Sequence, residues 1–349
     1  MLVGIFSLSF LSKIFKKKFV CPGAFSQVYI YPDGRVFLCP DCMMTKEAEI
    51  GDLNKQSFEE IWNSKTAMEI RKRILKGEYP FCKVPFCISR SNYNLRLIPT
   101  IGIKNKVRQD SYPKMVCIGA DAECNVNCIM CRSTISRISN DDLPLFNKKI
   151  DEIYLPILKS ADELTLSTTC DPFASRNTRL LMKSAAEMYP SLKFNLITNG
   201  ILCNKANCDE IGITEKLSRV MVSIHAATEE TYNKIVKNGN FSKVIENIEW
   251  LKEMKEKGLV KNLFFAFVVS SQNYKEIPLF IDFAEKYSAR ALFWGCISWG
   301  DNLLSCEGEP LDIIDPEHPR HYDFVNSLNV KKVKDHSSYF AVNIRRLIK

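Results

Sequence analysis

Three cysteines close together are the residues of this sequence with the clearest chemical meaning. The stretch CNVNCIMCR, residues 124–132, holds them at the spacing C-x3-C-x2-C. A structural zinc site takes four protein ligands, and a disulfide takes two thiols. Three thiolates from one tight loop suit a [4Fe–4S] cube whose fourth iron is left to a non-protein ligand. A zinc site completed by a distant ligand and a cysteine loop without metal are the alternatives.

A second group of cysteines lies nearer the N-terminus, at Cys21, Cys39, Cys42, Cys82 and Cys87. Four thiolates from this group would saturate a second [4Fe–4S] cluster, or a zinc site made of four cysteines; a module without metal is the other alternative. The spacing favours four of them as ligands and leaves Cys42 as the spare candidate. The four expected ligands are Cys21, Cys39, Cys82 and Cys87.

Composition places this chemistry in a soluble globular protein. The apolar fraction is 46% and the charged fraction 25%, as in ordinary soluble domains. Because the 14 cysteines of this 349-residue chain are clustered, we expect metal ligation in a reducing compartment, the cytoplasm, rather than a disulfide framework. The net charge of +8 comes from dispersed lysines and arginines, so we expect a solvated basic surface and no nucleic-acid partner.

The first 20 residues are expected to form a separate leader segment. They are apolar up to Lys13 and basic from Lys16 to Lys18. A secretory signal has its positive charge before the apolar run, and this stretch is also too short to span a bilayer. A packed or frayed leader and a weak contact with a membrane surface are both compatible with it.

Residues 114–349 alternate between short apolar strands and amphipathic helices. Helical patterns are clearest at 241–258 and 276–288. Strands joined by helices indicate parallel βαβ units, and six units fall short of the eight of a closed barrel. We therefore expect an α/β fold, a partial (β/α)6 TIM-like barrel with a C-terminal extension; an open doubly wound sheet is the alternative. The expected strands are 115–120, 163–168, 193–198, 219–224, 263–269 and 291–298.

Residues 21–90 predict a small cysteine-rich α+β module in front of the barrel. Residues 28–39 alternate around Pro32-Asp33-Gly34, which indicates a hairpin. Ser57 and Glu60 form the capping box of a first helix. A second helix is expected over 66–76, ended by Gly77, and residues 91–113 are expected to be an irregular linker.

The cysteine triplet and the strand–helix series together resemble a known protein family. The spacing of Cys124, Cys128 and Cys131, directly after the first strand of a six-strand βα series, resembles the radical S-adenosylmethionine (SAM) superfamily over residues 114 to about 300. The resemblance implies that the open iron binds the amino and carboxylate groups of SAM. It implies further that one electron, supplied by a flavodoxin- or ferredoxin-type donor, splits the sulfonium. The resulting 5′-deoxyadenosyl radical then removes a hydrogen atom from a substrate.

The family's Gly-Gly-Glu-Pro segment, which holds the SAM amino group, corresponds here to Thr169-Cys170-Asp171-Pro172. The carboxylate and the proline are kept, and both glycines are absent. Asp171 can still accept a hydrogen bond from an ammonium, and a helix N-cap is its other interpretation. Cys170 is either a catalytic residue facing the cofactor or a buried, inert thiol.

Further cofactor contacts follow from the same resemblance at the ends of later strands. His225 stands where the family usually has an acidic residue, and it is interpreted as a ribose contact, a proton acceptor or a structural histidine. Asn199, in ITNG, is also compatible with an ordinary turn. Ser223 and Asn273 are the other strand-end candidates, and Met130, just before the last cysteine of the triplet, is a candidate for backbone contacts to the adenine.

The N-terminal module resembles the twitch or SPASM auxiliary-cluster modules of the same superfamily, although those usually follow the barrel. An auxiliary cluster ligated by four cysteines favours acceptance of an electron, and hence a net oxidation or bond formation. The sequence thus predicts an oxidoreductase-like radical SAM enzyme acting on a small molecule, such as a sugar, or on a peptide. A non-catalytic iron–sulfur or zinc protein on a degenerate barrel is the alternative, supported by the missing glycines and by His225.

Overall fold

The computed structural model describes residues 20–40, 44–83, 106–131, 143–166, 169–296, 305–306, 308–336 and 339–349. The first 19 residues of the predicted leader, Cys42, Cys87 and residues 91–105 of the predicted linker lie outside the described residues. Residues 106–113 are irregular, as expected. No helix of the described ranges is long and apolar enough to cross a membrane.

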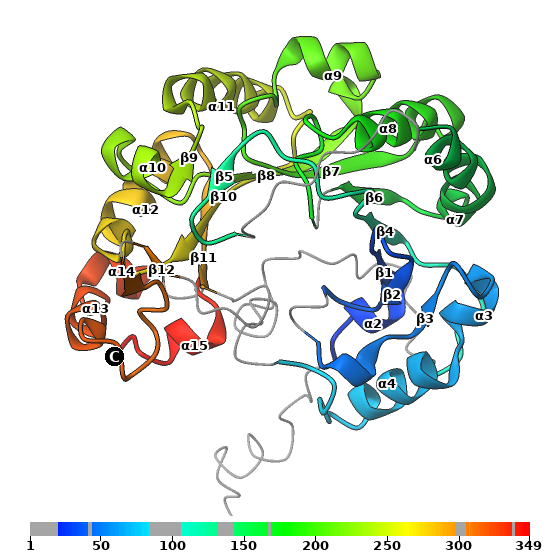
Figure 1. Cartoon of the computed structure of the whole chain (residues 1–349), viewed down its shortest axis with the longest axis horizontal. Coiled ribbons are helices and arrows are strands. Elements are labelled where there is room, and N and C mark those ends of the chain that lie inside the picture. The colour runs from blue at the N-terminus through cyan, green and yellow to red at the C-terminus, as the bar shows by residue number, and fades with distance from the viewer. Residues whose placement is uncertain are drawn as a thin grey trace, which may run out of the picture.

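The centre of the fold is a curved sheet with six parallel strands in the order β11-β10-β8-β7-β6-β4. Each strand falls within two residues of its predicted start, so the partial (β/α)6 barrel is confirmed (Figure 1). The sheet curves so that its carboxyl ends share one rim. The strands are β4 (Met115–Ile118), β6 (Glu163–Leu166), β7 (Lys193–Thr198), β8 (Leu217–Ser223), β10 (Asn262–Val269) and β11 (Arg290–Gly295).

Helices cover the outer face of this sheet (Figure 1). Several of these helices begin directly after a polar N-cap residue. The side chains of Asn204, Thr228 and Asn240 each accept a hydrogen bond from a backbone N–H of the first turn of their helix. The helices are α6 (Leu143–Lys149), the π-helix η6 (Ile150–Tyr154), α7 (Leu155–Leu158), α8 (Arg176–Met188), α9 (Lys205–Ile211), α10 (Glu229–Ile235), α11 (Phe241–Glu256), η8 (Tyr274–Glu276) and α12 (Ile277–Lys286).

The two faces of the sheet differ in polarity. Val116, Leu164 and Val220 belong to the main hydrophobic core, which lies under the helices. The residues next to these along each strand point to the other face, because side chains alternate between the two faces of a sheet. On four strands they lie in register and form a polar row on the concave face. The row consists of Cys117, Thr165, Asn195 and Arg219.

The N-terminal module extends the same sheet. Its first strand, β1 (Gln27–Ile30), pairs in parallel with β4, and β2 (Arg35–Phe37) and β3 (Gly51–Asp52) follow antiparallel. The predicted hairpin is confirmed, with Gly34 at a φ of 92°. Helices α2 (Gly23–Ser26), α3 (Phe58–Trp62) and α4 (Lys65–Leu75) and the 3-10 turn η2 (Lys46–Ala48) complete the module.

The capping box of the first module helix is also confirmed, because Ser57 and Glu60 satisfy each other's backbone amides at the start of α3. The second helix begins at Lys65, after the N-cap Ser64. Trp62 anchors the module to the segment that precedes the barrel, since its indole nitrogen donates to the carbonyl of Ser111 at 2.8 Å.

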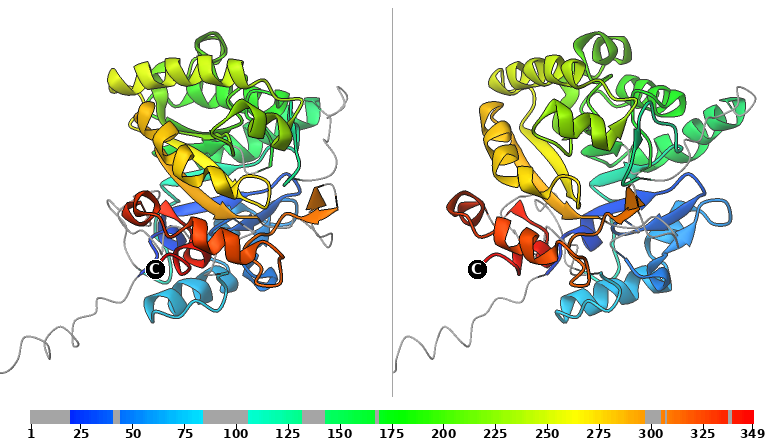
Figure 2. Two further views of the ribbon diagram at one scale, coloured as in Figure 1. Left: turned by 90° about the vertical axis from the view of Figure 1, so that its left-hand side faces the viewer. Right: turned by 60° about the vertical axis from the view of Figure 1, so that its left-hand side comes forward.

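The C-terminal extension lies at the other edge of the sheet, beside β11 (Figures 1 and 2). The rings of Phe293 and Phe340 stack with centroids 4.3 Å apart, which fastens the end of the chain to β11. The extension contains β12 (Ser305–Cys306), β13 (Glu309–Pro310), α13 (His321–Ser327), α14 (Lys331–Asp335) and α15 (Val342–Arg345).

Candidate metal centre

The cysteine triplet lies in the loop that leaves the carboxyl end of β4. Cys124, Cys128 and Cys131 are all half-buried. The backbone N–H of Cys131 donates to the carbonyl of Cys128 at 3.0 Å, which bends the chain sharply between them. The loop therefore presents its thiols at the rim where parallel α/β sheets carry their chemistry.

A two-stranded ribbon holds this loop from one side. Strand β5 (Asn127–Cys128) pairs antiparallel with β9 (Val236–Lys237), which directly follows α10. The N–H of Ile129 adds a hydrogen bond to the carbonyl of Ile235 at 3.0 Å. One of the three cysteines is thus part of a hydrogen-bonded ribbon.

The segment after β6 holds the loop from the other side. Thr169 donates from its hydroxyl to the carbonyl of Asp121, and the N–H of Asp171 donates to the carbonyl of Glu123 at 3.0 Å. Ser175 donates to the Asp121 carboxylate at 2.6 Å. The predicted counterpart of the family's glycine-rich segment therefore lies against the cysteine loop.

Asp171 is a buried junction. Its carboxylate accepts from the Thr198 hydroxyl at 2.7 Å and the Asn199 N–H at 2.9 Å, and from the amides of Phe173 and Ala174 at 3.0 and 3.2 Å. Burial raises its pKa, against the lowering effect of these hydrogen bonds. Four donors occupy the four acceptor positions of a carboxylate. The N-cap of α8 is Ser175, so Asp171 caps only the preceding turn.

Asn199 is the predicted candidate that reaches the cysteines. Its side-chain nitrogen lies 3.8 Å from the Cys124 sulfur and donates to the Asn125 side chain at 2.7 Å. Its side-chain oxygen accepts from the N–H of Ile201 at 3.0 Å. Both polar atoms of its side chain are therefore engaged, and the nitrogen lies toward a thiol of the triplet.

His225 follows β8 in a left-handed backbone conformation, with a φ of 63°. Its Nδ1 accepts from the N–H of Val268 at 3.1 Å, so the ring proton belongs on Nε2. Burial lowers the pKa of His225 to about 4. The imidazole is consequently neutral near pH 7, with Nε2–H as a donor, which fits a contact to a hydroxyl better than a proton acceptor.

Asn273 supports His225 directly. Its side-chain nitrogen donates to the carbonyls of His225 and Val268, each at 2.9 Å, and its oxygen accepts from the N–H of Ser270 at 2.8 Å. The predicted residue Asn273 is therefore a brace between the ends of β8 and β10. Ser223 is the half-buried last residue of β8.

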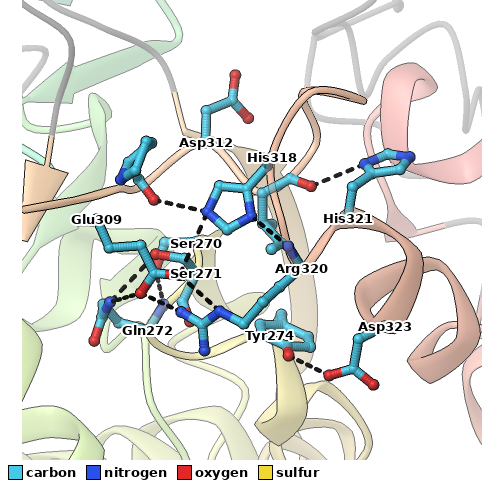
Figure 3. Close-up of polar contacts among 12 residues, drawn as sticks. Ser270, Ser271, Gln272, Tyr274, Glu309, Asp312, His318, Arg320, His321 and Asp323 are labelled. Atoms are coloured by element: carbon cyan, nitrogen blue, oxygen red, sulfur yellow. Dashed lines mark hydrogen bonds and ion pairs between the residues drawn. The ribbon is translucent and has the colours of Figure 1, made fainter.

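The C-terminal extension clamps the same loop (Figure 3). Arg320 donates to both carboxylate oxygens of Glu309, and to the carbonyl of Ser271 at 2.9 Å. The side-chain nitrogen of Gln272 donates to Glu309 at 3.1 Å. The loop that positions His225 is thus fixed by residues far along the chain.

The other predicted residues near the triplet are buried. The Cys170 thiol contacts the Thr178 hydroxyl at 3.4 Å, and burial raises the pKa of Cys170 to about 12. Such a thiol stays protonated and unreactive, which agrees with the inert interpretation. Met130 is 5% exposed and Pro172 is buried as well.

The module cysteines lie at the opposite end of the sheet. Cys21 precedes α2 and Cys39 follows β2, which places both beyond the amino end of β1. Cys82 forms a β-bridge with Met44. Because β1 and β4 run parallel, Cys21 and Cys39 lie at the opposite end of the sheet from the triplet.

Donors around the triplet fit an iron–sulfur cluster, whose sulfurs accept hydrogen bonds. Asn199 lies at the Cys124 sulfur. The buried hydroxyl of Tyr232, on the helix that leads into the strand paired with Cys128, has no hydrogen-bond partner among the described residues. No three His, Cys, Asp or Glu side chains in the described part of the chain lie close enough together to hold a single metal ion. A cluster needs no such convergence, since each thiolate binds its own iron.

Comparisons with known proteins identify the class. The model of the radical SAM superfamily matches residues 122–284, and that of the SPASM iron–sulfur cluster-binding domain matches residues 21–87. The chain therefore contains a radical SAM domain and, in front of it, an iron–sulfur cluster-binding domain of the SPASM type. These two domains imply [4Fe–4S] clusters and SAM as cofactors. None of the curated proteins matches the chain.

Several solved structures are similar to this chain at low identity. SuiB of Streptococcus suis bound to SAM is 14% identical with a TM-score of 0.40, over 75% of this chain and 52% of that chain. SuiB bound to the precursor peptide SuiA is 13% identical with a TM-score of 0.41, over 78% and 62%. TYW1 with a lysine–pyruvate adduct is 14% identical with a TM-score of 0.39, over 63% and 74%. The match spans little more than half of SuiB.

Proposed function

We propose that the chain reductively cleaves SAM and uses the radical to oxidise a substrate or to form a bond in it. The observation that carries this proposal is the triplet itself, placed in one loop at the carboxyl rim with the Asn199 amide at the Cys124 sulfur. Cys124, Cys128 and Cys131 would hold three irons of a [4Fe–4S] cluster. When bound, the cluster and SAM supply a 5′-deoxyadenosyl radical, which abstracts a hydrogen atom.

The chain's own residues would keep this site rigid and oriented. Asp171 locks the end of β7 to the segment after β6, and so fixes the backbone from which Asn199 projects. Its acceptor positions are filled, so we assign it this positioning role. His225, held neutral, offers its Nε2–H to a cofactor hydroxyl, and Ser223 and Met130 line the same rim.

The N-terminal module would hold the auxiliary cluster through Cys21, Cys39, Cys82 and Cys87, with Cys42 as the spare. Four thiolates leave no open position for a substrate, so the module serves electron transfer. Its place at the amino end of β1, opposite the triplet, supports a substrate lying between the two cysteine groups. An acidic redox protein of the flavodoxin or ferredoxin type would supply the first electron.

The substrate would be polar, a small molecule or a peptide. The concave face carries Thr165, Asn195 and Arg219 in register. Asn195 donates to the Glu163 carboxylate at 2.7 Å, yet its side-chain oxygen is buried without a partner among the described residues. Such an oxygen is suited to accept a hydrogen bond from a bound molecule.

The proposal is tested with anaerobically reconstituted full-length chain, dithionite and SAM. We expect 5′-deoxyadenosine to form, and deuterium from a labelled substrate to appear in it. Iron-loaded protein that yields no 5′-deoxyadenosine would instead support the non-catalytic alternative.

A further inference from the structure

Tyr232 carries a buried hydroxyl that has no hydrogen-bond acceptor in the described part of the chain. The side chain is 0% exposed, and its oxygen has no hydrogen-bond partner among the described residues. Buried hydroxyls are nearly always paired, because an unpaired one loses its hydrogen bonds with water without compensation. An unpaired donor inside a well-packed wall therefore indicates a missing acceptor.

Tyr232 belongs to the helix that leads into the ribbon holding the cysteine loop. Tyr232 lies on α10, one turn before Val236, which pairs with Cys128 in the β5–β9 ribbon. The tip of its ring lies against Gly239, where an added Cβ would come within 2.9 Å of the hydroxyl oxygen. The ring is held from the side by Phe241, with centroids 5.2 Å apart.

The direction of the pKa of Tyr232 agrees with a position near Cys128. After burial, the largest cause that raises the pKa of Tyr232 is its interaction with Cys128. The backbone N–H of Asn240 acts in the opposite direction, as a donor near the oxygen does. The hydroxyl proton has no acceptor among the described residues, and Cys128 is the cysteine of the triplet whose strand pairs with the segment directly after α10.

We infer that the Tyr232 hydroxyl donates a hydrogen bond to the Cys128 thiolate when the triplet holds its cluster. This inference rests on the proposed function, since it needs a cluster at the triplet. A donor to a cluster thiolate stabilises the more negative, reduced state and so raises the reduction potential. Tyr232 is thus a positioning and tuning residue that acts through Cys128, and it makes the cluster easier for the donor protein to reduce.

The test compares full-length protein with the variant Tyr232→Phe, both in a Cys21→Ala/Cys39→Ala background so that only the triplet cluster is observed. The midpoint potential is measured by a redox titration followed by electron paramagnetic resonance. We expect a more negative potential in Tyr232→Phe, up to a tenfold change in the ratio of reduced to oxidised cluster, about 59 mV for one electron. An unchanged potential with full iron content overturns the inference.

Tyr189→Phe is the matched control. It removes a hydroxyl that donates to the carbonyl of Leu155 at 2.7 Å, between α7 and α8, and its potential should equal that of the parent. Absence of any cluster signal in the parent would count against the proposed function and not against Tyr232 alone.

A second measurement tests the inference if the Tyr232→Phe variant fails to hold a cluster. Unsubstituted Tyr232 protein labelled with ring-deuterated tyrosine should show deuterium coupling to the reduced cluster in electron–nuclear double resonance. No coupling would mean that no tyrosine ring lies at the cluster, and the inference would fail.

Discussion

The side-chain nitrogen of Asn199 lies 3.8 Å from the sulfur of Cys124, although 75 positions separate the two residues. The contact joins the ends of two strands, β4 and β7, at the carboxyl rim of the barrel. Asp171 fixes the Asn199 backbone, and Asn125 shares its side-chain amide. The Cys124 thiol is therefore tied by a chain of hydrogen bonds to segments at the ends of three strands.

Replacing Asn199 should impair SAM cleavage without removing the cluster. In Asn199→Ala the three thiols remain, but Cys124 loses a donor. We expect unchanged iron content and a rate of 5′-deoxyadenosine formation about tenfold lower, which corresponds to about 1.4 kcal/mol. Asn207→Ala, at the Asn204-capped start of α9, is a control of the same kind away from the triplet. Equal rates for Asn199→Ala and the parent would remove the role given to Asn199.

Asp171→Asn should lower stability, since the amide NH2 cannot accept from the donors that the carboxylate now satisfies. Leaving one or two buried donors unpaired costs about 1–3 kcal/mol in the free energy of unfolding. Denaturant unfolding of the anaerobic protein measures it. Asp151→Asn, on the exposed surface of η6, should change little. If the free energy of unfolding changes no more in Asp171→Asn than in this control, the stabilising role given to Asp171 is wrong.

His225 predicts a specific pH dependence of stability. Its folded pKa is about 4, against an ordinary value of 6.5, so the unfolded state binds the proton first as the pH falls. The stability linked to this group is complete above pH 6.5 and is lost between pH 6.5 and about 4, by at most about 3 kcal/mol.

The variant His225→Asn tests this dependence, because asparagine accepts a left-handed backbone well and does not titrate. Its unfolding free energy, measured from pH 4 to 7, should fall less steeply than that of the parent. Parallel curves would show that His225 does not carry the effect.

The double variant Cys21→Ala/Cys39→Ala should lose one cluster and keep the other. Two [4Fe–4S] clusters correspond to about eight irons per chain, and the variant should retain about four. Cys306→Ala, a half-buried cysteine outside both groups, should retain about eight. Full iron content in the double variant would place the auxiliary cluster, if any, on other cysteines.

Local sequence signals predicted the elements well. Apolar runs with helices between them located all six parallel strands, and the Ser57–Glu60 capping box located α3, because both signals depend on residues close in sequence. The parallel pairing of β1 with β4 was not predictable in this way. It brings together segments that are far apart in the chain, and no local pattern specifies a partner strand.

The candidate site residues that belong to a local sequence motif could be predicted. The contacts that these residues make with distant parts of the chain could not. The cysteine triplet could be picked out as a candidate metal centre from its spacing alone. The filled acceptors of Asp171 depend on donors 27 and 28 positions away, and the clamp on the His225 loop depends on Glu309 and Arg320. Tyr232 was missed because a buried aromatic residue on a helix is ordinarily core; its signal, an unpaired hydroxyl, exists only in three dimensions.

The central claim is that one iron at the triplet has no protein ligand and is open to SAM. Electron–nuclear double resonance of the reduced chain with SAM labelled with 15N at its amino group and 17O at its carboxylate tests this most directly. We predict 15N and 17O couplings to the cluster, which Cys131→Ala abolishes. A fully assembled cluster that shows neither coupling would contradict the account.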